Sequence, residues 1–179
     1  MPTHVVSEEM DDVALVARQL GRAPRAFRRV VVRCPYGAPA VTEQHPYDAD
    51  GEPFPTTYYL TCPQLVASIA RLEAAGGVGR WSDEAAREEM LAASLDRATE
   101  EQALVRRALA GGREGRDHGA SLGLGIAGSG SPAQLKCLHA HVAYALARPG
   151  YELGERIMAE VDPLWPPDGC CSSALRVTS

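Results

Sequence analysis

Two short β-prone segments, each followed directly by a Cys-Pro pair, constrain the fold of this chain most. Residues 27–33 contain three consecutive valines, and residues 56–61 read Thr-Thr-Tyr-Tyr-Leu-Thr. β-Branched and aromatic residues favour strands, and a proline directly afterwards forces the chain to turn. If both strands belong to one sheet, the thiols of Cys34 and Cys62 emerge at the same edge.

Helical periodicity dominates the sequence after the second of these segments, and residues 40–44 supply a third candidate strand. Apolar residues recur at helical spacing in the ranges 8–20, 63–75, 84–110, 133–147 and, more briefly, 151–161. Strands early in the chain and helices late in it predict an α+β fold. We expect a small antiparallel sheet of about three strands packed against several helices, with helices dominating the C-terminal two thirds.

Length and composition are typical of a single domain. The chain has 179 residues, of which 45% are hydrophobic and 23% are charged. We place the domain at residues 1–162, and we expect residues 163–179 to form a tail that is disordered or folded back on the thiols. No apolar run is long enough to cross a membrane, and the acidic residues 1–12 lack the apolar segment of a secretory signal. We therefore expect a cytoplasmic protein without a membrane partner.

Arginine is concentrated near the N-terminus of an otherwise acidic chain. The net charge of −5 gives no reason to expect a nucleic acid as partner. Six arginines from Arg18 to Arg33 form a basic face, which is either a solvated surface or a binding surface for an anion or a protein partner. The exposed face of the predicted helix at residues 84–110 is a second candidate surface for a protein partner.

The cysteines are the residues with the most distinctive chemistry. They are Cys34, Cys62, Cys137, Cys170 and Cys171. An odd number in a chain without a secretory signal argues against a set of structural disulfides. The sequence therefore predicts reduced thiols, which either bind a metal ion or are buried as small apolar residues of the core.

The predicted helix at residues 133–147 carries one of these thiols beside two histidines. The segment Ser-Pro-Ala-Gln at residues 131–134 matches a capping box with proline at the first helical position, which predicts a helix beginning at residue 133. Cys137 and His141 are then four residues apart and lie on adjacent turns. His139 falls on the apolar side of the same helix, which is typical of a packed core histidine.

A shared thiol and imidazole site is the leading functional hypothesis. Cys34, Cys62 and Cys137 supply three ligands of one metal centre, and His141 or Cys171 supplies the fourth. Such ligands suit a tetrahedral zinc ion or an iron–sulfur cluster. The spacings match no local metal-binding signature, so this hypothesis depends on the fold bringing the residues together.

A glycine-rich stretch, residues 123–130, leads into the same predicted helix. It is either a flexible connector or an anion-binding loop, because backbone N–H groups at a helix start attract anions. The candidate anion-binding residues are Arg33, Gly128, Gly130, Ser131 and Lys136.

Two other functions are consistent with the same residues. In the first, Cys137 or His141 performs nucleophilic or acid–base catalysis on an anionic small substrate, which Arg33, Lys136 and the glycine-rich stretch hold. In the second, the protein is a non-catalytic interaction module, and its cysteines belong to the core.

Several short motifs occur in an order that is similar to a known family. They are Gln19-Leu20-Gly21-Arg22-Ala23-Pro24-Arg25, Arg33-Cys34-Pro35-Tyr36-Gly37, Pro53-Phe54-Pro55-Thr56, Leu60-Thr61-Cys62-Pro63, Arg71-Leu72-Glu73 and Lys136-Cys137-Leu138-His139-Ala140-His141. Over about residues 8–155 the chain resembles the bacterial domain of unknown function 501 family, which is common in actinobacteria. The resemblance implies family cysteines at Cys34, Cys62 and Cys137, and one near the C-terminus that Cys170 or Cys171 matches. It implies no particular reaction, but it favours a shared thiol site.

Overall fold

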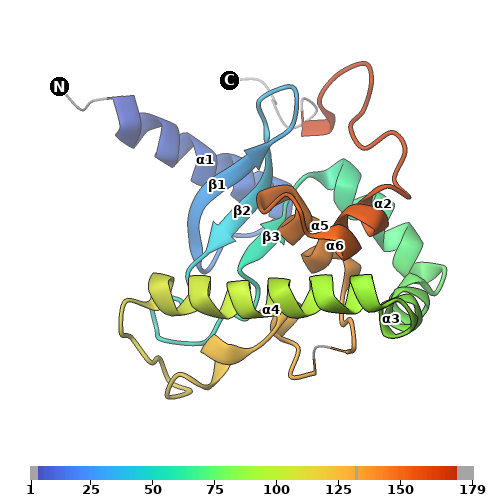
Figure 1. Cartoon of the computed structure of the whole chain (residues 1–179). Helices are drawn as coiled ribbons and strands as arrows, with labels where there is room; N and C mark the ends of the chain where they lie inside the picture. Colours follow the sequence, from blue (N-terminus) through green and yellow to red (C-terminus); the bar gives the residue numbers. More distant parts are fainter. Residues whose placement is uncertain (1–3, 132, 173–179) are drawn as a thin grey trace.

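The computed structural model describes residues 4–131 and 133–172, which form a small sheet surrounded by helices (Figure 1). The strands are β1 (Phe27–Arg33), β2 (Pro39–Gln44) and β3 (Tyr58–Leu60). The helices are α1 (His4–Leu20), α2 (Pro63–Ala74), α3 (Gly77–Arg87), α4 (Glu89–Ala110), α5 (Leu138–Ala147) and α6 (Glu152–Met158), with short 3-10 helices η1 (Ala120–Gly123) and η2 (Ile126–Gly128). None of the described helices combines the length and the apolar character needed to cross a membrane.

The sheet has the strand order β1-β2-β3, and both pairs are antiparallel, so the expected α+β fold is confirmed. β2 is the central strand, and all of its residues are buried. Burial of a charge requires compensation, and Glu43 of β2 is paired with Arg28 and Arg29 of β1. β3 lies at one edge of the sheet and packs against α5.

α5 lies at the centre of the fold, in contact with all three strands and with α6. Seven of its ten residues are buried, as is typical of a helix that is apolar on every side. Gly154 allows α6 to pack closely against α5, because a Cβ atom at this position would lie only 2.7 Å from the carbonyl oxygen of His141. Both sides of the predicted helix are therefore packed, including the side that carries His141 and Tyr144.

The predicted start of this helix at residue 133 is wrong. α5 begins at Leu138, and Cys137 before it has an extended backbone, with φ −159° and ψ 122°. Residue 132, the proline of the predicted capping box, lies outside the described residues. The N–H group of Leu138 donates a 2.6 Å hydrogen bond to the Glu73 carboxylate of α2. The helix is therefore capped by a residue far away in the sequence, which a local capping motif does not reveal.

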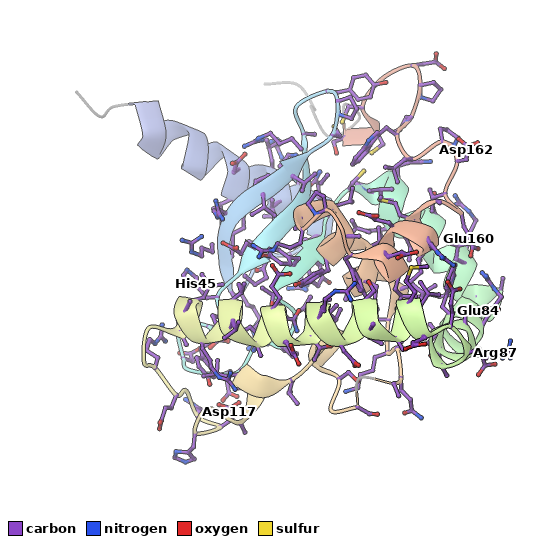
Figure 2. All side chains as sticks on the ribbon, viewed as in Figure 1. His45, Glu84, Arg87, Asp117, Glu160 and Asp162 are labelled. Atoms are coloured by element: carbon purple, nitrogen blue, oxygen red, sulfur yellow. The ribbon has the colours of Figure 1, made fainter. Side chains whose placement is uncertain are left out.

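The predicted helix at residues 84–110 is divided in the structure. Glu88 has an extended backbone, with φ −104° and ψ 110°, and it separates α3 from α4. Figure 2 shows Glu84 and Arg87 on α3 close to this bend. The Glu88 carboxylate accepts two hydrogen bonds of 2.9 Å from Arg156 of α6. This contact between distant segments stabilises a break that helical periodicity does not reveal.

The segment after α6 returns to the turn between β1 and β2, residues 34–38, which we call the hairpin end of the sheet (Figure 1). There the Tyr36 hydroxyl donates a 2.5 Å hydrogen bond to the Pro166 carbonyl oxygen. Gln19 of α1 donates a 3.0 Å hydrogen bond to the Ser172 hydroxyl. The described part of the predicted tail, residues 163–172, thus lies against the sheet, whereas residues 173–179 lie outside the described part of the chain.

Candidate metal centre

The structure places the four predicted metal ligands in three different surroundings. Cys34 and Cys62 lie near the hairpin end, each beside a cysteine of the C-terminal segment. Cys137 precedes α5 and lies close to Glu73 and His139. His141 lies in the core, beside Tyr151. The single centre expected from the sequence is therefore not assembled in this arrangement.

His141 has the surroundings of a neutral core residue. It is 2% exposed, and its Nδ1 atom shares a 2.7 Å hydrogen bond with the Tyr151 hydroxyl. Burial lowers the pKa of His141 to about 3, because the charged imidazolium loses its hydration. Because Cys137 is not on the helix, the expected spacing of one turn between Cys137 and His141 does not exist.

Cys137, His139 and Glu73 form a compact group of potential ligands. One atom from each, the thiol sulfur, a ring nitrogen and a carboxylate oxygen, lie within 4.8 Å of one another. The Nδ1 atom of His139 lies 3.1 Å from Oε1 of Glu73. Cys137 is in the extended residue before α5, and His139 is in the first turn, so the thiol and the imidazole reach the same side. Glu73 joins them from the last turn of α2.

The contacts of the His139 ring show which of its two nitrogen atoms carries a proton. Nε2 lies 3.1 Å from the carbonyl oxygen of Val66, which only accepts hydrogen bonds, so Nε2 carries a proton. Nδ1 then faces the negative carboxylate of Glu73 and requires a cation between the two atoms. In the absence of a metal ion this cation is a second proton. The pKa of His139 is raised to about 9, chiefly by its hydrogen bond with Cys137 and further by the Val66 carbonyl and the Glu73 charge.

A cavity of about 380 Å³ opens beside this group. Lys136, Cys137 and His139 line it together with Thr56, residues 58–60 of β3, Val66 of α2, Ala127 and Ala140. Such a mixture of apolar walls and a few polar groups is typical of small-molecule sites. The group is therefore accessible to a small ligand from this side.

The fold separates Arg33 from the other predicted anion-binding residues. Arg33 pairs with Asp12 at the hairpin end, whereas Gly128 packs against Pro55 and its carbonyl oxygen accepts a 2.8 Å hydrogen bond from Lys136. The N–H group of Gly128 is bonded to the Gly125 carbonyl, and the N–H group of Ser131 to the Ser129 hydroxyl. The start of α5 is already occupied by the carboxylate of Glu73. Gly130 and Ser131 are exposed on the same loop.

Several arginines of the predicted basic face are paired within the chain. Arg25 is bonded to Asp48, and Arg28 and Arg29 share Glu43. These pairs balance part of the positive charge that the sequence concentrates there. A protein partner on this face, or on the exposed face of α4, stays a prediction.

The remaining four cysteines form two pairs near the hairpin end. The sulfur atoms of Cys34 and Cys170 are 3.8 Å apart, and those of Cys62 and Cys171 are 3.7 Å apart. The structure has no disulfide between them. Burial raises the pKa of Cys34, and it raises the pKa of Cys62 to about 12. Cys34 and Cys62 are therefore poor nucleophiles in the absence of a metal ion.

Comparison with known protein families assigns the chain to one of them. A family profile described as Protein of unknown function (DUF501) matches residues 30–159. The chain belongs to this family. The matched region contains Glu73, Cys137 and His139, whereas Cys170 and Cys171 lie after it. No curated protein and no solved structure matches the chain.

Sequence reasoning missed two members of the compact group. Glu73 ends the motif Arg71-Leu72-Glu73, which entered only through the resemblance and not as a ligand. His139 was assigned to the core because the helix was expected to begin five residues too early, at residue 133 rather than at Leu138. In a helix, residues two apart do not share a face, so the spacing Cys-Leu-His at residues 137–139 predicts no contact there. The spacing becomes informative only because Cys137 is extended and lies before the helix.

Proposed function

We propose that the protein binds a zinc ion through the Cys137 thiolate, Nδ1 of His139 and the carboxylate of Glu73. The observation that carries this proposal is the convergence of the three ligand atoms within 4.8 Å of one another. Nδ1 and Oε1 are 3.1 Å apart, close to the edge of about 3.3 Å expected between two ligands of a tetrahedral zinc ion. A zinc ion bound there would take the place of the proton between Nδ1 of His139 and Oε1 of Glu73.

The surroundings of the three residues support a metal site. Metal-bound histidines usually donate the other ring N–H to a carbonyl or carboxylate, and Nε2 of His139 lies 3.1 Å from the Val66 carbonyl. The Glu73 carboxylate is oriented by the N–H group of Leu138. Sulfur, imidazole and carboxylate together suit zinc better than the hard cations magnesium or calcium, which prefer oxygen alone.

The geometry favours this function over a cysteine-dependent catalytic triad. In a triad, the acid and the nucleophile contact opposite nitrogens of the imidazole ring. Here the acid Glu73 is on Nδ1, and the opposite nitrogen is bonded to the Val66 carbonyl. No ring nitrogen is left on the far side to accept a proton from Cys137.

A centre with three protein ligands leaves a fourth position for water or a ligand, as catalytic zinc sites do. The adjacent cavity is the route to that position, and the nearby Lys136 ammonium favours a small anionic ligand. When bound there, zinc polarises a carbonyl or phosphoryl oxygen or lowers the pKa of water. We place this function in the cytoplasm, because the thiols of the centre must stay reduced to bind the metal ion.

The test is zinc binding by the full chain, stripped of metal by a chelator and kept under reducing conditions. His139→Gln removes a ligand, and Glu73→Gln removes the charge while retaining an oxygen that accepts the Leu138 N–H bond. Loss of a residue that is only hydrogen-bonded to a metal ligand usually weakens metal binding by about 10–100-fold. Because each variant alters a ligand itself, we expect a larger loss of zinc affinity at this centre. His118→Asn and Glu100→Gln are matched controls at exposed positions and should bind zinc as the unaltered chain does.

Cobalt provides a second readout. Co²⁺ bound at this centre should contribute a thiolate-to-metal charge-transfer band, and this contribution should be lost in Cys137→Ser and in His139→Gln. Zinc binding that is the same in these variants and in the unaltered chain would refute the proposed centre, as would a freshly purified protein that takes up no zinc at all.

A further inference from the structure

The fold brings four thiols to the hairpin end of the sheet, outside the Cys137 centre. Cys34 follows β1, and its N–H group donates to the Ala38 carbonyl at 2.9 Å. Cys62 follows β3, and its N–H group lies 3.4 Å from the Ala40 carbonyl. Both residues therefore flank the start of the central strand β2, one on each side.

Two adjacent residues of the C-terminal segment reach these two thiols separately. Cys170 lies beside Cys34, with 3.8 Å between the sulfur atoms, and Cys171 lies beside Cys62, with 3.7 Å between them. In a tetrahedral site with zinc–sulfur bonds of about 2.3 Å, neighbouring sulfur atoms are about 3.8 Å apart. Each pair thus has the separation of two sulfur ligands of one zinc ion.

We infer that Cys34, Cys62, Cys170 and Cys171 form a second, four-cysteine zinc site that fastens the C-terminal segment to the hairpin end of the sheet. Four protein ligands leave no open position, so this site is structural. It does not depend on the centre at Cys137, because it uses none of the same side chains.

The two pairs stand further apart than a bound ion requires. Among the described residues, only Glu73, Cys137 and His139 have all their ligand atoms within 4.8 Å of one another. Cys170 and Cys171 are adjacent in the chain, and each lies beside one of the two thiols that flank the start of β2, so a bound ion would draw the two pairs together by movement of these side chains. The metal ion therefore completes a site that the backbone has already brought together.

Backbone N–H groups also surround the sulfur atoms. The N–H group of Ser172 donates to the sulfur of Cys170 at 3.3 Å. The N–H groups of Tyr36 and Ala38 face the sulfur of Cys34. Hydrogen bonds to sulfur are typical outer partners of metal-bound thiolates, because they stabilise the negative charge.

A metal ion explains how the C-terminal segment is held. The polar contacts that join it to the rest of the fold include an exposed one between Tyr36 and Pro166 and a part-buried one between Gln19 and Ser172. Leu164 and Trp165 are only partly buried against the core. Contacts of this kind release easily, whereas a four-thiolate zinc site closes a long loop at a fixed point.

The experiment counts zinc ions in the full chain after anaerobic purification. We expect two per chain in the unaltered protein and one in either Cys170→Ser or Cys171→Ser. Both substitutions lie in the C-terminal segment, at residues that are only partly buried. Cys137→Ser is the matched control, since it should also leave one zinc ion, held by the four remaining cysteines.

The two sites are distinguished by their cobalt absorption spectra and by how far zinc protects the C-terminal segment from hydrogen exchange. With cobalt, Cys137→Ser should retain the strong charge-transfer band of a four-thiolate site, and Cys171→Ser should retain the weaker band of a single thiolate. Zinc should slow hydrogen exchange at residues 163–172 in the unaltered chain and in Cys137→Ser, but not in Cys171→Ser.

Three results would overturn this inference. One is an equal zinc content in the unaltered chain, Cys170→Ser and Cys171→Ser. Another is a mass loss that corresponds to disulfides between the paired cysteines in protein purified under reducing conditions. The third is visible absorption from bound iron with no zinc, which would assign the thiols to an iron–sulfur cluster.

Discussion

His141 should make the protein progressively less stable between about pH 6.5 and pH 3. The folded state holds this histidine neutral, with its pKa lowered by burial to about 3, whereas the unfolded chain has an ordinary value of about 6.5. Between these values the unfolded state binds the additional proton, so stability falls as the pH falls. From about pH 7.5 to about pH 5, linkage gives a loss of about 2 kcal/mol in the free energy of unfolding.

The assay is urea unfolding of the chelator-treated chain at both pH values, compared between the unaltered protein and His141→Gln. Glutamine does not titrate, so the variant is destabilised at both pH values but should lack this loss of about 2 kcal/mol. His118→Asn is the control, because His118 is exposed, and it should behave as the unaltered chain does. His45, whose pKa is also lowered by burial, is present in all three proteins, so its contribution cancels.

An equal loss of stability in His141→Gln and in the unaltered protein would refute the assignment of His141 as a neutral core residue. If the variant does not fold, nuclear magnetic resonance of the unaltered chain gives the same information. The His141 ring signals should show no titration above about pH 4. A midpoint near the ordinary value of about 6.5 would contradict the buried geometry.

Two further substitutions test how the helices around the candidate centre are held. Gly154→Ala should cost about 1–3 kcal/mol in urea unfolding, because the added Cβ would lie 2.7 Å from the carbonyl oxygen of His141. Gly79→Ala, in α3 with open space around it, is the control and should be neutral or slightly stabilising, so equal effects at the two glycines would contradict the packing argument. Arg106→Met should destabilise the protein by about 2–4 kcal/mol in the same assay, because it leaves the carbonyl oxygens of Phe54 and Ser121 without their buried donor. A change within about 0.5 kcal/mol would mean that water replaces the guanidinium.

Local sequence patterns were sufficient for the kinds of elements in this chain. The valine run of β1 and the apolar periodicity of α2 and α4 depend on each segment's own residues, and these elements lie close to where the patterns place them. The two Cys-Pro pairs stand just after β1 and β3, where a proline prevents the strand from continuing, and the condition that both strands belong to one sheet is met.

Contacts between distant segments decided the rest. Glu73 caps α5 from another helix, and this moves the start of the helix from residue 133 to Leu138. That shift moves Cys137 away from His141 and beside His139. A capping motif reports only on neighbours in the sequence, whereas the position of a ligand atom depends on which distant carboxylate or thiol the packing brings near it. The sequence therefore determined which chemical groups are present, and the tertiary structure determined which of them meet.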